Sequence, residues 1–174
     1  MTKIKIVLDT DVIIHFAKGG YLGILPTIFP NYDFIVLNNV YKEIKGNIKT
    51  QLDNQVCLLK NISIEDFSPK GEMLYEYARI KSLPNMGDGE SSCMAYCRYT
   101  HNVIGSSNLR DIKDYCQKNK ITFLTTIDFL FYAIKYGKMK KEEEATQFII
   151  DVRKNESNLP DTDFDSYLPN AQLF

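Results

Sequence analysis

The feature of this sequence that most constrains its fold is the alternation of short apolar segments with longer amphipathic ones. Segments 3–9, 33–39, 102–107 and 121–126 are short, apolar and rich in β-branched or aromatic residues, as strands are. Helical patterns of about 10 to 15 residues separate them, which is typical of parallel strands joined by crossovers. The sequence therefore predicts an α/β fold, a three-layer α/β/α sandwich with a mainly parallel central sheet.

The helices are expected between and after these strands. Their predicted ranges are 11–20, 21–30, 40–48, 69–83, 88–101, 108–119, 127–139 and 140–156, with the last two forming a hairpin hinged at Gly137. Asn38 or Asn39 is expected to cap the helix over 40–48. Segment 56–64 reads either as an edge strand or as a connection. Residues 1–154 are predicted to form one domain, with 155–174 a tail that is packed on it or frayed.

Length and charge limit the class of protein. The chain has 174 residues, enough for one domain with a genuine core. Its formal net charge is −1, so no overall basic field indicates tight, non-specific DNA binding. No apolar run is long enough to span a bilayer, and the N-terminus lacks a signal-peptide pattern. We therefore expect a cytoplasmic protein with no membrane partner.

The cysteines do not form a metal-binding pattern. Cys93 and Cys97 are spaced CxxxC on a predicted helix, Cys57 and Cys116 stand alone, and the chain has 2 histidines. We expect the four cysteines to be buried, reduced core thiols rather than zinc ligands or disulfides.

Two aspartates interrupt the apolar stretch "IKIVLDTDVIIHF" at residues 4–16. Asp9 ends the first predicted strand, and Asp11 follows after a single threonine. Carboxylates at the mouth of a buried strand repel each other and lose solvation unless a cation or hydrogen-bond donors compensate. Such a partner is therefore expected there.

Further acids follow in positions that could meet these two. Glu43 lies one helical turn after the second strand, Asp88 and Glu90 open the helix over 88–101, and Asn108 and Asp111 follow the next strand. In parallel sheets, ligands bind beyond the carboxyl ends of the strands, so these side chains are expected along one rim. Oxygen donors without histidine or thiolate suit Mg²⁺ or Mn²⁺, which can activate water and stabilise the leaving oxygen of a phosphodiester.

Each acid except Asp9 also has an ordinary structural interpretation. Asp11 could cap the first helix, and Glu43 could be a solvated helix residue. Asp88 and Glu90 could be first-turn acids that the helix dipole favours. Asp111 could be a surface acid. The functional interpretation therefore depends on the set of acids rather than on any single one.

The order of the motifs "IVLDTDVII", "NNVYKEI", "GDGESSCMAYC" and "VIGSSNLRDI" resembles the PIN domain, particularly its small toxin-type members. The segment "AIKYGKM…FIIDVRKNESNLP" also resembles the C-terminal helical pair of one branch of that family. The likeness covers nearly the whole chain, although each motif alone is short. Ser106 and Ile112 replace the usual threonine and phenylalanine of the fourth motif, and both replacements are conservative.

The resemblance implies a divalent-metal-dependent endoribonuclease acting on single-stranded RNA, often as the toxin of a toxin–antitoxin pair. It implies catalytic roles for Asp9, Glu43, Glu90 and Asp111. It also implies a Mg²⁺ or Mn²⁺ site formed by Asp9, Glu90 and Asp111. The spacing to the fourth motif fits Glu90 better than Asp88, but the Gly-Asp-Gly-Glu motif contains both acids, so Asp88 stays a further candidate ligand. Supporting or phosphate-binding roles fall to Asp11, Ser106 and Asn108. A homodimer and an antitoxin partner are also implied.

Two other functions fit parts of the sequence. "VLDTDVI" also satisfies the pattern of haloacid dehalogenase-like phosphatases, with Asp9 as nucleophile and Asp11 as acid/base. That reading leaves Glu43 and Glu90 without a role, and the expected lysine is not evident. The second alternative is a non-catalytic PIN-like module that binds RNA or a protein. Lys42, Lys45 and Lys49 are close enough in sequence to Glu43 to meet phosphates, but we interpret them as a solvated helix face.

Overall fold

A computed structural model describes residues 3–171 of the chain. Within these residues the structure contains a 5-stranded sheet in the order β3-β2-β1-β4-β5, and every strand pair is parallel. The strands are β1 (Lys5–Leu8), β2 (Asp33–Leu37), β3 (Ile62–Glu65), β4 (Val103–Gly105) and β5 (Phe123–Leu124). Ile6, Val7 and Leu8 of the central strand are fully buried, which explains its uninterrupted apolar sequence.

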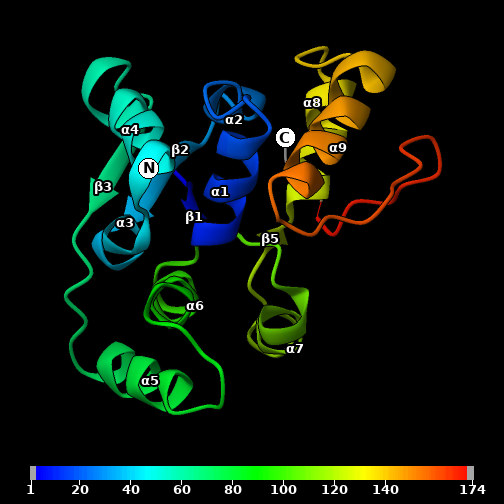
Figure 1. Cartoon of the computed structure of the whole chain (residues 1–174). Coiled ribbons are helices and arrows are strands. Elements are labelled where there is room, and N and C mark those ends of the chain that lie inside the picture. Colours follow the sequence, from blue (N-terminus) through cyan, green and yellow to red (C-terminus); the bar gives the residue numbers. More distant parts are fainter. Residues whose placement is uncertain (1–2, 172–174) are drawn as a thin grey trace.

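Helices cover both faces of this sheet. They are α1 (Thr10–Lys18), α2 (Leu25–Ile28), α3 (Asn38–Glu43), α4 (Gly46–Asp53), α5 (Glu72–Lys81), α6 (Asp88–Thr100), α7 (Leu109–Asn119), α8 (Thr126–Lys135) and α9 (Thr146–Lys154), with π-helical turns η1 (Asn54–Leu58) and η2 (Lys141–Ala145). Figure 1 shows α1, α2, α8 and α9 on one side of the sheet and α5, α6 and α7 on the other. The predicted three-layer α/β/α sandwich with a parallel sheet is confirmed. No helix within the described residues is long and apolar enough to cross a membrane.

The strand order reverses between β1 and β4. From β1 the chain proceeds outward to β2 and then β3, and it returns across the sheet to place β4 on the other side of β1. In the registers, Val7 lies opposite Ile35 of β2, while Leu8 lies opposite Gly105 of β4. Loops that leave neighbouring strands toward opposite sides open a crevice at such a switch point, where ligands bind in folds of this type.

The predicted helices over 21–30 and 40–48 differ from the structure, and only Leu25–Ile28 of the first is helical, as α2. The helix expected over 40–48 is divided, because the backbone of Ile44 is extended and buries that side chain, and Gly46 adopts a φ of +59° at the start of α4. Asn38 does not cap the helix with its side chain. It is the first residue of α3, and its side-chain oxygen accepts a hydrogen bond from Phe67 N at 3.2 Å in the segment after β3.

Segment 56–64 combines helix and strand. Its first part belongs to the π-helical turn η1, and its last residues enter β3, which is an edge strand. Cys57 lies in that turn and is exposed, so the prediction that every cysteine is buried is wrong for this one. Cys93, Cys97 and Cys116 are buried free thiols, as expected.

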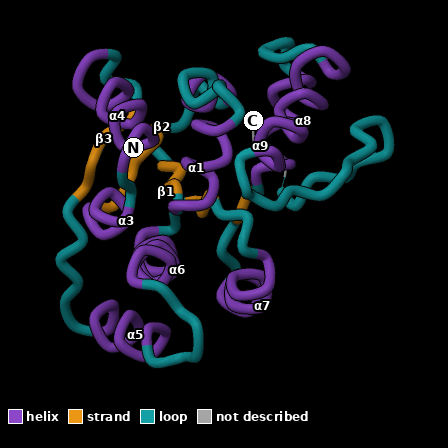
Figure 2. Tube along the Cα trace, in the orientation of Figure 1, coloured by secondary structure: helices purple, strands orange, loops and turns teal. Residues whose placement is uncertain are grey.

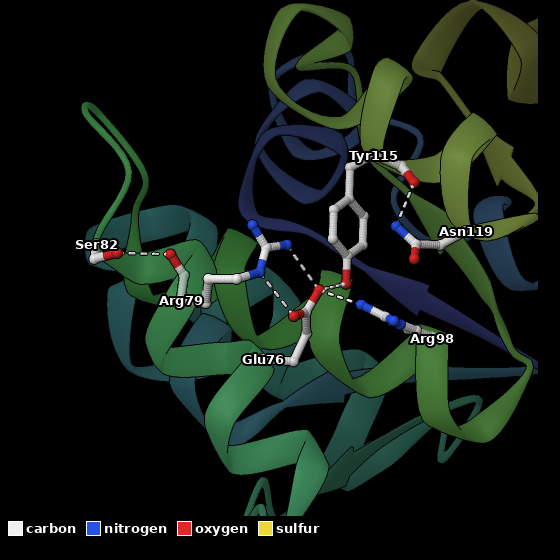
Figure 3. A network of polar contacts seen from close by, with 6 residues as sticks. All are labelled: Glu76, Arg79, Ser82, Arg98, Tyr115 and Asn119. Atoms are coloured by element: carbon white, nitrogen blue, oxygen red, sulfur yellow. Dashed lines mark hydrogen bonds and ion pairs between the residues drawn. The ribbon is translucent and has the colours of Figure 1, made fainter.

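A buried glutamate connects the three helices on the α6 side of the sheet (Figure 3). Glu76 of α5 accepts hydrogen bonds from Arg79 Nε at 2.9 Å and from the Tyr115 hydroxyl of α7 at 2.8 Å, and it pairs with Arg98 of α6. The hydrogen bonds from Arg79, followed by those from Tyr115 and the nearby positive charges, lower the pKa of Glu76 to about 2. The network fixes α6 between α5 and α7.

The tail after α9 contains no helix or strand in residues 155–171 (Figure 2), and one of the residues that hold it is a buried acid. Asp128 of α8 is 0% exposed and accepts hydrogen bonds from the Tyr167 hydroxyl at 2.9 Å and from both Asn170 N and Nδ2 at 2.8 Å. Thr125 adds two more donors to the same carboxylate. The tail is therefore packed onto the domain through a carboxylate that hydrogen-bond donors surround.

We expect Asp128→Asn to destabilise the protein by roughly 2–4 kcal/mol, because an amide group turns an acceptor into a donor that faces other buried donors. Limited proteolysis should then cut residues 155–171 faster than in the wild type. Asp114→Asn, at an exposed acid on α7, is the control. Equal midpoints in urea for the two variants would contradict the role assigned to Asp128.

Candidate active site

Asp9 stands at the switch point, directly after β1. Its N–H donates to the carbonyl of Gly105 at 2.8 Å, extending the pairing of β1 with β4 by one residue. Its carboxylate accepts a hydrogen bond from Thr10 N at 2.8 Å and caps α1. The capping role considered for Asp11 therefore belongs to Asp9, and that interpretation of Asp11 is wrong. Asp9 is only 5% exposed.

Asp11 connects the first turn of α1 to the loop after β4. Its Oδ2 accepts a hydrogen bond from Ser107 N at 2.7 Å, and the Ser106 hydroxyl lies 3.4 Å from the same oxygen. Its other oxygen accepts from Val12 N at 2.6 Å. Because both oxygens are held, Asp11 fixes the two sides of the crevice relative to each other.

Glu43, the last residue of α3, reaches the beginning of α6. Its two oxygens accept hydrogen bonds from Gly89 N at 2.8 Å and from the Thr10 hydroxyl at 2.7 Å. A Cβ atom added at Gly89 would lie 2.8 Å from Glu43 Oε2, so the absence of a side chain at Gly89 permits this approach. Glu43 is exposed, but the structure fixes its carboxylate rather than leaving it as a free surface acid.

A single amide joins Glu90 and Asp111. Asn108 Nδ2 donates to Glu90 Oε1 at 2.8 Å and to Asp111 Oδ2 at 2.7 Å. Asn108 is the N-cap residue of α7, yet its side chain makes no capping hydrogen bond, because it is used by the two acids. Arg110 also contacts Asp111, at 3.2 Å. We call Asp9, Asp11, Glu43, Glu90 and Asp111 the acidic cluster.

Asp88 does not join the acidic cluster. It pairs with Lys81 and accepts a hydrogen bond from the Tyr77 hydroxyl, both on α5. Residues two positions apart on a helix project in widely different directions, about 200° apart, so Asp88 and Glu90 cannot face the same site. The structure therefore places Glu90, and not Asp88, beside the other acids.

The buried members of the cluster have raised pKa values. Burial, followed by the charge of Asp11, raises the pKa of Asp9 to about 7, with a smaller contribution from Glu43. Burial raises the pKa of Asp11 to about 6. Burial, followed by the charges of Asp9 and Asp111, raises the pKa of Glu90 to about 7. Within residues 3–171, no lysine or arginine forms an ion pair with these three acids.

The cluster has the donor chemistry of a site for a hard divalent cation. It offers carboxylate oxygens without thiolate or imidazole, the set that Mg²⁺ and Mn²⁺ prefer, and a cation would relieve the repulsion that raises the pKa values. No three histidine, cysteine or acidic side chains of the described residues already stand where they could hold a metal ion together. Thr10 and Gly89 donate hydrogen bonds to Glu43, and Asn108 donates to one oxygen of Glu90 and one of Asp111, so a bound cation would compete with these donors.

Comparison with known proteins gives a distant structural likeness. No protein-family model matches this sequence, and no curated protein matches it. Among solved structures, the chain is similar to a PilT N-terminus domain protein from the hyperthermophilic archaeon Sulfolobus solfataricus P2. The two share 13% sequence identity with a TM-score of 0.48, over 80% of this chain and 98% of the other. The candidate site is defined by the hydrogen bonds and burial of its residues, and not by this likeness.

Several residues that hold the acids were not identified as site residues from the sequence, among them Thr10, Gly89 and Ser107. Gly89 had a visible signal, since it separates the two acids of the Gly-Asp-Gly-Glu motif. The three lysines interpreted as a solvated helix face differ in their surroundings. Lys42 and Lys45 are exposed, whereas Lys49 lies over the ring of Tyr41 and donates a hydrogen bond to the Tyr41 carbonyl at 3.3 Å.

We expect Asp9→Asn to stabilise the metal-free protein at pH 8, on the order of 2 kcal/mol, since asparagine keeps the helix cap and removes a buried charge. A raised carboxyl pKa means that the folded state holds a proton the unfolded state has lost, so the wild type loses stability as pH rises from about 4 to about 7. The advantage of the variant should shrink toward pH 4. Urea unfolding with EDTA, from pH 4 to pH 8, measures it.

Glu76→Gln is the matched control of opposite sign. The lowered pKa of Glu76 stabilises the fold above about pH 4.5, and this stabilisation is lost as pH falls toward 2. Glu76→Gln should therefore destabilise the protein at pH 8. If Asp9→Asn is also destabilising at pH 8 without metal, the charge repulsion assigned to the cluster is wrong.

Proposed function

We propose that this protein is a divalent-metal-dependent endoribonuclease that cuts single-stranded RNA. The observation that carries the proposal is the acidic cluster itself. Four chain segments bring five carboxylates to the switch point, and the three whose pKa values are raised, Asp9, Asp11 and Glu90, have no cationic partner within the described residues. A cluster that costs free energy in the absence of a cation is best explained by a cation that it binds in use.

Four of the five acids of the cluster have a chemical role in this proposal. Asp9, Glu90 and Asp111 would hold Mg²⁺ or Mn²⁺, with Asn108 orienting the last two. When bound, the cation would supply the positive charge that activates water and stabilises the leaving oxygen of a phosphodiester. Glu43, exposed and held by Thr10 and Gly89, is oriented to accept a proton or to complete the cation site.

The surface around the cluster offers cations for the phosphates of a strand. Arg110, next to Asp111, has a side chain 78% exposed, and Lys42, next to Glu43, is also exposed. They lie on α7 and α3, the helices on either side of α6 in Figure 1, so a strand that crosses the cluster could contact both. The roles of cytoplasmic toxin, antitoxin partner and homodimer belong to the proposal through the motif resemblance.

No observation favours the phosphatase alternative. That mechanism uses Asp9 as a nucleophile and needs a lysine beside it, and no lysine within residues 3–171 pairs with Asp9 or Asp11. Asp11, its supposed acid/base, is already held by Ser107 N and Val12 N.

The test is cleavage of a panel of single-stranded and structured RNAs with Mg²⁺ or Mn²⁺, with EDTA as a blank. Asp9→Asn and Glu90→Gln should each lower the rate by at least about 100-fold, because losing even an outer partner of a metal site costs about 10–100-fold. Asp88→Asn is the matched control, two residues from Glu90 on the same helix but outside the cluster, and should change the rate less than about threefold.

The pattern across these variants decides the proposal. Equal loss in Asp88→Asn and Glu90→Gln would contradict the assignment of the cluster. Absence of cutting by the folded, metal-loaded protein, together with phosphate release from small phosphomonoesters, would replace the nuclease by the phosphatase.

A further inference from the structure

A cavity at the C-terminal tail adjoins the acidic cluster but is not part of it. It has a volume of about 570 Å³ and lies between the beginnings of α7 and α8 and the C-terminal tail. Its lining is formed by Ser107, Leu109, Thr125, Ile127, residues 158–163, Ser166, Tyr167, Leu168 and Asn170. The size falls within the roughly 300–1,000 Å³ of small-molecule sites. We call it the tail pocket.

The tail pocket and the cluster share one loop. Ser107 lines the pocket, while its N–H holds the carboxylate of Asp11 at 2.7 Å. Leu109, the next lining residue, follows Asn108, which bridges Glu90 and Asp111. A chain of nucleotides with one phosphate at the cluster would therefore have a neighbouring base within reach of the pocket.

The walls of the pocket suit a flat ring. Leu109, Ile127 and Leu159 are apolar, and Tyr167 contributes an aromatic ring. That ring is already fixed, because its hydroxyl donates to Asp128 at 2.9 Å and its centroid lies 5.7 Å from that of Phe131. Aromatic side chains among apolar groups are the usual support for an unstacked base.

The polar lining indicates what kind of ring would bind. None of the pocket-lining residues is a lysine or arginine, and two are the acids Asp161 and Asp163. A phosphate would be repelled, whereas an exocyclic amino group, with two N–H donors, would find acceptors. Asp161 is paired with Arg153 at 2.6 Å. Asp163 accepts from the Ser166 hydroxyl at 2.8 Å and from Asp165 N at 3.1 Å, which leaves acceptor capacity on its carboxylate.

We propose that the tail pocket holds an unpaired nucleobase that carries an amino group, next to the phosphate placed at the acidic cluster, so that the tail sets sequence preference. Guanine, adenine and cytosine carry an amino group, whereas uracil does not. The inference rests on the proposed nuclease function for the position of the phosphate. Leu109 and Asp163 are then specificity-determining residues, outside the group that performs the chemistry.

Binding without catalysis is measured first. The full chain, in EDTA, is titrated with guanosine, adenosine, cytidine, uridine and inorganic phosphate, and shifts of backbone amide signals are followed by NMR. Amino-bearing nucleosides should perturb residues 107–109 and 158–170, with at least one binding about fivefold or more tightly than uridine. Leu109→Ala should weaken that binding about fivefold or more. Leu83→Ala, at a leucine of similar exposure outside the pocket, should not.

A second variant tests the pocket without removing an apolar side chain from its wall. Asp163→Asn, at an exposed position, should reduce the preference for cytidine over uridine while leaving the fold intact. On a pool of random single-stranded RNA, wild-type cuts should show a base preference at one fixed position from the scissile bond, and Leu109→Ala should flatten it.

The outcomes separate the two proposals. Nucleoside binding at the tail pocket without any RNA cleavage would contradict the proposed nuclease function and support the base-binding role of the pocket. RNA cleavage without nucleoside binding, and with an unchanged cut-site preference in Leu109→Ala, overturns the base pocket. Binding of inorganic phosphate at residues 158–170 would also overturn it.

Discussion

The parallel pairing of β1 with β4 is the constraint on which the rest of the structure depends. It reverses the strand order beside the most buried strand, and the hydrogen bond from Asp9 N to the Gly105 carbonyl carries the pairing to the edge of the sheet. One side of the resulting crevice is α1 with Asp9 and Asp11, and the other is the loop after β4 with Ser107 and Asn108. The helix before β4 must begin at the same edge, which brings Glu90 there.

The acids inside this protein are of two kinds, those whose negative charge is compensated by neighbouring groups and those whose charge is not. Asp128 is surrounded by hydrogen-bond donors, and Glu76 by two arginines and a tyrosine, so both strengthen the structure. Asp9, Asp11 and Glu90 also accept hydrogen bonds, but none of them has an ion-pair partner among the described residues, and burial together with their mutual repulsion raises their pKa values. A group of three carboxylates whose charges no cation balances indicates a site adapted to something that binds it.

The sequence predicted the sheet and the position of the acids because both follow from local pattern. Apolar segments ending in Asp9 or followed by Asn108 indicate strand ends, and parallel strands bring those ends to one edge. It could not separate Asp88 from Glu90, since that depends on Lys81 and Tyr77 of another helix. The division of the helix at Ile44 and the tail pocket likewise depend on tertiary contacts that no local pattern carries.

The measurement that tests the central claim most directly is a calorimetric titration of the metal-free protein with Mn²⁺, at pH 6.5 and pH 8.5, in buffers of different ionisation enthalpy. The account predicts binding well below millimolar Mn²⁺, abolished in Asp9→Asn and retained in Asp88→Asn. It also predicts proton release that is larger at pH 6.5, because raised pKa values keep carboxyl groups of the cluster protonated there. Absence of Mn²⁺ binding by the folded wild type, or binding that Asp9→Asn leaves unchanged, would contradict it.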